Sequence, residues 1–314
     1  MSGPRHDVPP AEPDTAGPEA DDAALLAAAR EAAEAAAAVH AEARGGVEPS
    51  RWSEKGRSDF VTEVDVEAEL RIVAILRHRF PGHGILAEEG STGADGCDGD
   101  GAAPGQAAPG RPGTIRWIID PLDGTTNWLH GYPEYAVSLA AADAAGPRVG
   151  LVLNSATGER FEAVRGAGAR RDGAPIRVSE IASLRLALVG TGFPFKKLDS
   201  LPAYLEAFSR VLRATSGIRR GGSAALDLCD LACGRLDAFF EYWLMPWDVA
   251  AGGLIVREAG GCFGTLDAPG VPPPDAAVVP GLPPGGYIGA NAALARPFRL
   301  LVAADAPDAG RAGA

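Results

Sequence analysis

The segment over residues 117–128, WIIDPLDGTTNW, constrains the fold more than any other part of the chain. An apolar run ends abruptly at Asp120, and Pro121 is expected to stop the strand because proline cannot donate a hydrogen bond to a sheet. Asp123 is the expected cap of a helix whose first turn carries two threonine hydroxyls. The segment therefore predicts a strand, a tight turn and a helix start, with two carboxylates at the carboxyl end of the strand.

The chemistry of this turn favours a site for a metal ion and a phosphate. Neighbouring carboxylates are costly unless a cation neutralises them, and the backbone N–H groups of Gly124, Thr125 and Thr126 at a helix start attract an anion. Mg²⁺ fits best, because it prefers oxygen ligands and shares them between carboxylates and substrate phosphate. The alternative is that Asp120 and Asp123 are only turn and cap residues, but a string of this length rarely arises by chance.

The motif D-P-x-D-G-T-x-N over residues 120–127 resembles the signature of the inositol monophosphatase family. Residues 247–252 are similar to the family's W-D-x-A-A-G motif, and residues 61–65 to its V-T-x-x-D motif. The paired glutamates Glu88 and Glu89, after an apolar run, match as well. Several separate segments therefore carry the resemblance.

The resemblance extends over about residues 22–303 and implies an α+β fold, a layered α-β-α-β-α sandwich. We expect an N-terminal α+β part over residues 21–184 that carries most metal ligands, and a C-terminal α/β part over residues 185–303. Residues 1–20 are rich in Pro, Ala, Asp and Glu and are expected to be disordered, and residues 304–314 to form a frayed tail.

The resemblance also implies a role for individual residues. Two Mg²⁺ ions are expected, and the family also allows a third, weaker ion near Glu88 and Asp65. The implied metal ligands are Glu88, Asp120, the carbonyl of Leu122, Asp123 and Asp248. Thr125 and Asp65 are expected to orient the attacking water, with Glu88 as a further catalytic residue. Asp65 also suits the first turn of a helix through the helix dipole alone.

The implied substrate contacts are spread over three segments. They comprise Gly124, Thr125, Gly222, Ser223, Ala224, Glu241 and Asp248. A backbone turn and a carboxylate can recognise a polyol through directional hydrogen bonds. A helix cap and a charge at a strand end remain the alternative reading of residues 222–224 and of Glu241.

The spacing of apolar residues and the positions of turn residues such as glycine and proline predict the remaining elements. Helices are expected over residues 21–44, 62–80, 202–213 and 245–261, with further starts near residues 223 and 292. Strands are expected over residues 84–89, 136–142, 149–153, 160–164, 186–189, 218–220, 238–242 and 287–290. The second of these helices is expected to place Val66, Leu70, Val73 and either Leu76 or Arg77 roughly on one face. Loops are expected over residues 90–113 and 267–286.

Composition narrows the function. The 314 residues carry a net charge of −12 and a pI near 4.9, which argues against nucleic acid as a main ligand. The four cysteines form no disulfide pattern, and the five histidines no close zinc-binding pair. No apolar run is long enough to span a membrane, and no signal peptide is recognisable, so a cytoplasmic protein is expected. A homodimer is expected from the family.

The expected activity is Mg²⁺-dependent, lithium-sensitive hydrolysis of a small phosphorylated polyol, with myo-inositol monophosphate as the first choice. Phosphatases of histidinol phosphate and of fructose 1,6-bisphosphate share the implied metal ligands and stay open as alternatives. The resemblance is strongest to bacterial members of the SuhB type, which can also bind the transcription machinery. A regulatory function is therefore the alternative from a different class.

Overall fold

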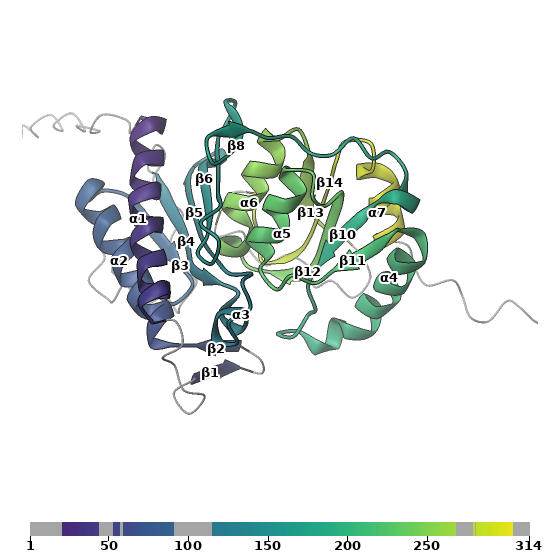
Figure 1. Cartoon of the computed structure of the whole chain (residues 1–314), viewed down its shortest axis with the longest axis horizontal. Helices are drawn as coiled ribbons and strands as arrows, with labels where there is room; N and C mark the ends of the chain where they lie inside the picture. The colour runs from purple at the N-terminus through teal and green to yellow at the C-terminus, as the bar shows by residue number, and fades with distance from the viewer. Residues whose placement is uncertain are drawn as a thin grey trace, which may run out of the picture.

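The computed structural model describes residues 21–43, 53–56, 59–90, 115–267, 279 and 281–303. The expected disordered extension at residues 1–20, nearly all of the loop at 90–113, much of the loop at 267–286 and the expected frayed tail lie outside these residues. The described chain forms helices and two large sheets in alternating layers (Figure 1). This arrangement confirms the expected layered α+β fold.

The first layer is a pair of helices packed against a sheet. Asp21 caps α1 (Asp22–Glu42), whose buried face consists largely of alanines, and small side chains let it lie close to α2 (Glu63–Arg79). Both helices cover one face of a seven-stranded sheet ordered β3-β4-β5-β6-β7-β8-β9 (Figure 1). Its strands are β3 (Gly84–Ala87), β4 (Arg116–Asp123), β5 (Ala136–Asp143), β6 (Gly146–Asn154), β7 (Arg160–Val164), β8 (Gly168–Arg171) and β9 (Ala174–Pro175).

The predicted face of α2 is wrong for two of its residues, although Val73 and Leu76 are buried. Val66 and Leu70 are 36% and 45% exposed, whereas the inward face carries Asp65 and Glu69 together with apolar residues. The backbone N–H of Glu89 donates to the carboxylate of Glu69 at 2.8 Å. Carboxylates that bind neighbouring turns therefore occupy inward positions of α2, whereas a prediction from apolar spacing would place charged residues on the solvent face.

The second sheet is five-stranded, with the order β11-β10-β12-β14-β13. Helices α4 (Leu201–Ala214) and α7 (Ala295–Ala303) pack on one face, and α5 (Ala224–Ala232) and α6 (Pro246–Glu258) on the other, between the two sheets (Figure 1). The strands are β10 (Leu188–Thr191), β11 (Gly217–Arg219), β12 (Ala238–Leu244), β13 (Cys262–Thr265) and β14 (Gly285–Ala290). Short elements complete the fold: β1 (Ser53–Gly56), β2 (Asp59–Val61), α3 (Thr125–Leu129), η2 (Leu184–Leu186) and η3 (Leu198–Ser200).

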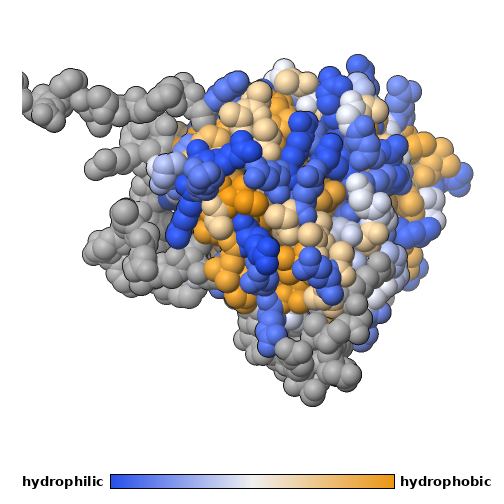
Figure 2. Space-filling view, turned by 60° about the vertical axis from the view of Figure 1, so that its left-hand side comes forward, coloured by the Kyte–Doolittle hydropathy of each residue, from blue (hydrophilic) through white to orange (hydrophobic). Residues whose placement is uncertain are grey.

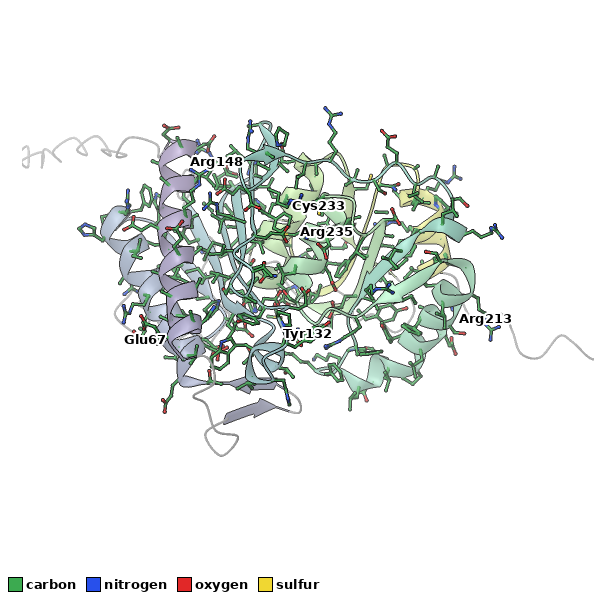
Figure 3. The ribbon with its side chains drawn as sticks, viewed as in Figure 1. Glu67, Tyr132, Arg148, Arg213, Cys233 and Arg235 are labelled. Atoms are coloured by element: carbon green, nitrogen blue, oxygen red, sulfur yellow. The ribbon has the colours of Figure 1, made fainter. Side chains whose placement is uncertain are left out.

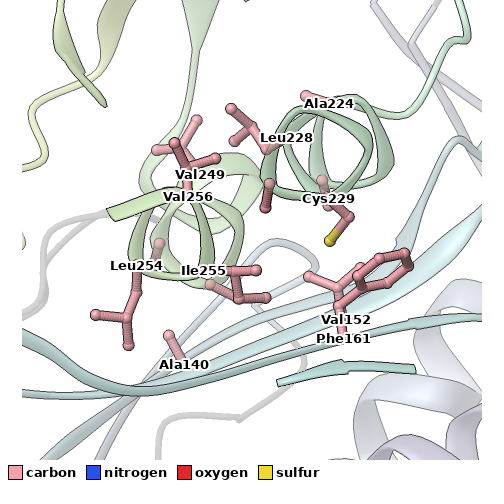
Figure 4. Packing of buried hydrophobic residues seen from close by; sticks show 14 of the residues in the cluster. Ala140, Val152, Phe161, Ala224, Leu228, Cys229, Val249, Leu254, Ile255 and Val256 are labelled. Atoms are coloured by element: carbon pink, nitrogen blue, oxygen red, sulfur yellow. The ribbon is translucent and has the colours of Figure 1, made fainter. Parts of the chain in front are cut away.

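The central helices α5 and α6 pack closely through buried hydrophobic side chains (Figure 4), and glycines lie at two of the tightest contacts. A Cβ at Gly252 would lie 2.8 Å from the Cβ of Leu228 on α5, and one at Gly150 of β6 would lie 3.0 Å from the carbonyl oxygen of Ala251 on α6. Glycine inside a helix costs about 1 kcal/mol relative to alanine. At Gly252 it allows α5 to approach α6 closely.

Ion pairs join the layers at the surface. Arg235, labelled in Figure 3, lies just after α5 and donates to Glu159, which precedes β7, with the closest N–O distance 2.5 Å. Arg148 of β6 similarly pairs with Asp22 of α1 at 2.5 Å. Figure 2 shows hydrophilic side chains interleaved with hydrophobic ones on the side that carries α1 and α2. No helix in the described part of the chain is both long and apolar enough to cross a membrane.

Candidate active site

The carboxyl ends of β3 and β4 bring the first two acidic residues together. These strands are parallel, with Ala87 opposite Ile119, so Glu88 and Asp120 follow at the same edge of the sheet. The backbone N–H of Glu88 donates to the carbonyl of Ile119 at 3.2 Å. Pairing of strand ends therefore places residues 32 positions apart side by side.

The expectation that Pro121 ends the strand is wrong, because β4 continues to Asp123. The pairing with β5 shifts between Asp120 and Asp123, and an irregularity of this kind accommodates a proline that cannot donate to the ladder. Asp120 is 1% exposed and accepts a hydrogen bond from the backbone N–H of Leu122 at 3.0 Å. The irregular pairing thus leaves Asp120, Leu122 and Asp123 together at the end of β4, where all three line the pocket described below.

The predicted helix cap is also wrong. Gly124, in the left-handed region with φ 96°, is the residue before α3, and a Cβ there would lie 2.8 Å from the carbonyl oxygen of Glu134. Asp123 instead accepts hydrogen bonds from the Ser223 hydroxyl at 2.6 Å and from the backbone N–H of Ala225 at 2.7 Å. Its side chain therefore links the first half of the chain to the start of α5.

One pocket of about 170 Å³ collects most of the predicted site residues, between α3 and the carboxyl ends of β10 and β12. Two of the elements that line it, α3 and β12, are labelled in the lower centre of Figure 1. Its acidic lining consists of Glu88, Asp120, Asp123, Asp227, Glu241 and Asp248, and its basic lining of Lys196 and Arg220. The predicted neutral contacts Leu122, Gly124, Thr125, Gly222, Ser223 and Ala224 line it as well.

The acidic residues repel one another. Burial raises the pKa of Asp120 well above its usual value, and the charges of Glu88, Asp123 and Asp248 raise it further. Burial likewise raises the pKa of Glu241 well above normal, and the charge of Asp227 raises it further. Such a cluster is stabilised by a bound cation.

Asp65 lies directly behind the pocket. It is 2% exposed, and its Oδ1 accepts a hydrogen bond from the Thr125 hydroxyl at 2.9 Å. Its Oδ2 accepts from the backbone N–H and the hydroxyl of Thr62 at 2.8 and 2.6 Å. Burial raises the pKa of Asp65, while these bonds to Thr62 and Thr125 oppose the rise. Asp65 therefore closes the capping box of α2 and also orients Thr125.

Asp248 serves the start of α6 in the same way. Its Oδ2 accepts a hydrogen bond from the backbone N–H of Met245 at 2.7 Å. Asp248 thus lies in the first turn of α6 and caps the start of the helix. Its charge also acts on Asp120 across the pocket. The aspartate of the W-D-x-A-A-G motif therefore has both a structural contact and a place in the acidic cluster.

The donors in this cluster fit Mg²⁺ by their chemistry. They are carboxylate and carbonyl oxygens, which hard divalent ions prefer. Within the described residues no three His, Cys, Asp or Glu side chains are arranged to hold an ion. Asp120, Asp123 and Asp248 each accept hydrogen bonds from protein donors.

Sequence reasoning missed part of the pocket wall. Residues 192–196, together with Arg220, Asp227 and Trp243, line the pocket, and none of them was predicted as a catalytic, metal or substrate residue. Burial raises the pKa of Asp227 well above normal, followed by the charges of Asp230 and Asp123. An aspartate at an inward position of an otherwise apolar helix was the available signal.

The chain was compared with known proteins. The sequence profile described as Inositol monophosphatase family matches residues 21–294. The chain belongs to this family. A relative from Pseudomonas aeruginosa, named Nus factor SuhB, is 47% identical over 211 residues, which cover 67% of this chain and 73% of the relative. The inositol-1-monophosphatase of Synechocystis sp. is 42% identical over 219 residues, covering 68% and 70%.

Solved structures of this family share the fold. The SuhB protein of Bartonella henselae superposes with a TM-score of 0.76 at 33% identity and covers 90% of this chain and 100% of its own. The inositol monophosphatase from Anabaena has a TM-score of 0.70 at 31% identity, with coverage of 88% and 94%. Both names, phosphatase and SuhB, therefore occur among similar proteins.

Proposed function

We propose that the protein hydrolyses a small phosphate monoester with Mg²⁺ as cofactor, and that myo-inositol monophosphate is its substrate. The observation that carries this proposal is the hydrogen bond from Thr125 to Asp65, at 2.9 Å, beside the acidic cluster of the pocket. The family membership supports the same reaction class.

The metal ligands follow from the donor set. Glu88, Asp120 and the carbonyl of Leu122 would hold one Mg²⁺ ion, and Asp120, Asp123 and Asp248 a second. When bound, Mg²⁺ supplies positive charge for the phosphate and acidifies a bound water. The Leu122 carbonyl oxygen lies 3.1 Å from the hydroxyl oxygen of Thr125, and a carbonyl oxygen has two lone pairs for partners.

Thr125 and Asp65 orient the nucleophilic water. A threonine hydroxyl has one hydrogen and two lone pairs, and that of Thr125 donates its hydrogen to Asp65. Its lone pairs therefore face outward as acceptors, which fixes one O–H of a water and leaves an oxygen lone pair directed at phosphorus. Asp65 is the base to which the proton can pass through Thr125.

The polyol part of the substrate would lie against the second half of the chain. The Ser223 hydroxyl donates to Asp123 and accepts from the Leu226 N–H at 3.3 Å, so recognition near Ser223 falls to the backbone of residues 222–224. Glu241 lines the pocket opposite and offers carboxylate oxygens to ring hydroxyls. Backbone groups near Ser223 and the carboxylate of Glu241 would together bind a small leaving group that carries hydroxyls.

The test is phosphate release by purified protein from myo-inositol 1-phosphate, histidinol phosphate and fructose 1,6-bisphosphate, each with Mg²⁺ or with EDTA. We expect Mg²⁺-dependent release that is fastest with the inositol ester. Faster release from another ester would retain the reaction class and replace the substrate. No release from any monoester would overturn the proposal.

A second candidate function is favoured by the names of the relatives. Several of them are named Nus factor SuhB, including the protein from Escherichia coli, which is 41% identical over 209 residues. In this alternative the protein is a cytoplasmic regulator that binds the transcription machinery. Its test is co-purification of RNA polymerase components with the wild type and with Asp123→Asn. Equal co-purification by both would show a binding function that does not need the metal site.

Dimerisation remains part of the proposal. A small phosphorylated polyol and a second copy of the chain are the partners that we propose. Sedimentation equilibrium at micromolar concentration tests the second, with a monomer mass as the contrary result.

A further inference from the structure

Residues 192–197, GFPFKK, form a compact turn over the pocket, which we call the strap. The strap follows β10 and leads into η3. The backbone N–H of Phe195 donates to the carbonyl of Phe193 at 2.8 Å, and that of Lys197 donates to Pro194 at 3.0 Å. These bonds give the strap a defined shape.

The base of the strap is fixed against the pocket wall. A Cβ on Gly192 would lie 2.2 Å from Oε1 of Glu241, so glycine lets the chain pass this carboxylate without displacing it. Phe193 packs edge-on against Tyr204, with ring centroids 5.7 Å apart. The guanidinium of Arg220 lies 5.2 Å from the centre of the Phe195 ring. An arginine over an aromatic face is a favourable contact, so the strap is held from both sides.

The two adjacent lysines of the strap face different partners. Nζ of Lys196 lies 3.8 Å from Oε1 of Glu88, which belongs to the first half of the chain. Nζ of Lys197 lies 4.6 Å from the centre of the Trp243 ring. Lys196 lines the pocket and Lys197 does not. The strap thus carries one cation across the pocket from the second sheet to the first.

The contact between Lys196 and Glu88 is poorly suited to a purely stabilising role. The Lys196 side chain is 44% exposed, and an exposed ion pair contributes little stability. The distance of 3.8 Å is that of an ion pair without a direct hydrogen bond. The pocket's acidic lining outnumbers its basic lining by six residues to two, and a phosphate dianion must enter it. A compact ammonium group at the rim offsets this repulsion, as lysines do at other phosphate sites.

We propose that Lys196 is a specificity-determining residue that contacts the phosphate group of the ligand in this pocket, an inference that rests on the proposed hydrolase function. Glu88 keeps the ammonium group on the side of the pocket where the acidic cluster is expected to bind Mg²⁺ and phosphate. The strap supplies this cation from outside the D-P-x-D-G-T segment. Lys196 therefore selects anionic ligands over neutral polyols of the same shape.

The test measures binding of inorganic phosphate to the Mg²⁺-loaded protein by titration calorimetry, so that it does not depend on turnover. Lys196→Gln is expected to weaken phosphate binding about tenfold, as for the loss of one charge-assisted hydrogen bond. Lys196→Arg should retain affinity within about threefold, because arginine keeps the charge and the donors. Lys197→Gln removes the same charge from the neighbouring residue and should leave phosphate affinity unchanged.

Mg²⁺ binding without phosphate provides the second measurement. Lys196→Gln should bind Mg²⁺ as tightly as the wild type or more tightly, because the change removes a competing cation beside Glu88. In turnover assays the same variant should raise KM more than it lowers kcat. This split distinguishes a phosphate contact from a damaged metal site.

Two results would overturn the proposal. One is unchanged phosphate affinity in Lys196→Gln, and the other is an equal loss in Lys197→Gln, which would indicate a general charge effect. If the wild type hydrolysed no monoester while phosphate binding still depended on Lys196, the hydrolase function would fail and the phosphate contact would stand.

Discussion

The replacement Asp65→Asn tests the catalytic part of the account with little change in shape. Asp65 accepts hydrogen bonds from Thr125 on one oxygen and from Thr62 on the other. An asparagine can accept on one side only and donates on the other. If its oxygen keeps the Thr62 bonds, its amide group faces Thr125 and reverses the polarity of that contact.

The magnitude follows from this reversal. Positioned acid–base groups contribute about 10²–10⁴-fold to rate, so we expect Asp65→Asn to lower kcat by about 10²–10³-fold. Stability should change by only about 1 kcal/mol, because lost charge-assisted bonds are offset by relief of the burial that raises the pKa of Asp65. Thr62→Ala is the matched control, since it removes the N-cap of α2 at a cost of about 1 kcal/mol and leaves the bond from Thr125 to Asp65 in place.

The assay is phosphate release under saturating Mg²⁺, alongside urea unfolding of both variants. Both variants should change in stability by about 1 kcal/mol, but only Asp65→Asn should lose activity. A kcat for Asp65→Asn within about threefold of the wild type, or an equal loss of kcat in Thr62→Ala, would refute the reasoning, because a general acid–base contribution is normally far larger.

Three further changes test the fold and the pocket. Burial lowers the pKa of His40 to about 4 from 6.5, so the unfolded chain binds a proton that the native protein refuses between these values, and stability is lost as pH falls through this window. Urea unfolding at pH 7.5 and at pH 5 measures this loss, and the free energy of unfolding should fall by about 2 kcal/mol more in the wild type than in His40→Leu. Equal falls would contradict the lowered pKa of His40. Gly192→Ala places a Cβ 2.2 Å from Glu241 and should displace that carboxylate, raising KM for inositol phosphate about tenfold with an unchanged Mg²⁺ requirement; an unchanged KM would argue against Glu241 as a substrate contact. Gly252→Ala meets Leu228 at 2.8 Å, and the overpacking cost of about 1–3 kcal/mol should exceed the gain in helix propensity of about 1 kcal/mol, which thermal unfolding would measure as a lower midpoint.

The regular elements could be predicted where local pattern and packing agree. Apolar runs bounded by turn residues gave β5, β6 and β7 close to their observed ends, and the capping threonine gave the start of α2. The failures came where distant partners decide. Pro121 remains within β4 because β5 resumes pairing at Asp123, and local sequence does not encode that register.

The site shows the same division. Asp120 and Asp123 belong to a contiguous motif over residues 120–127 that a family resemblance can identify. The orientation of Asp123 toward Ser223, in contrast, depends on where α5 begins. Lys196 reaches Glu88 only because the two sheets meet across α5 and α6. Residues separated by 100 positions or more come together by packing, which periodicity alone does not reveal.

The most direct test of the central claim is a Mg²⁺ titration of phosphate release from myo-inositol 1-phosphate by the wild type and by Asp123→Asn, with Li⁺ added in parallel. The account predicts release by the wild type that rises with Mg²⁺ and is inhibited by Li⁺, and almost none by Asp123→Asn at any Mg²⁺ concentration. Release that does not depend on Mg²⁺, or near-normal turnover by Asp123→Asn, would contradict a metal-dependent phosphatase built on this acidic cluster.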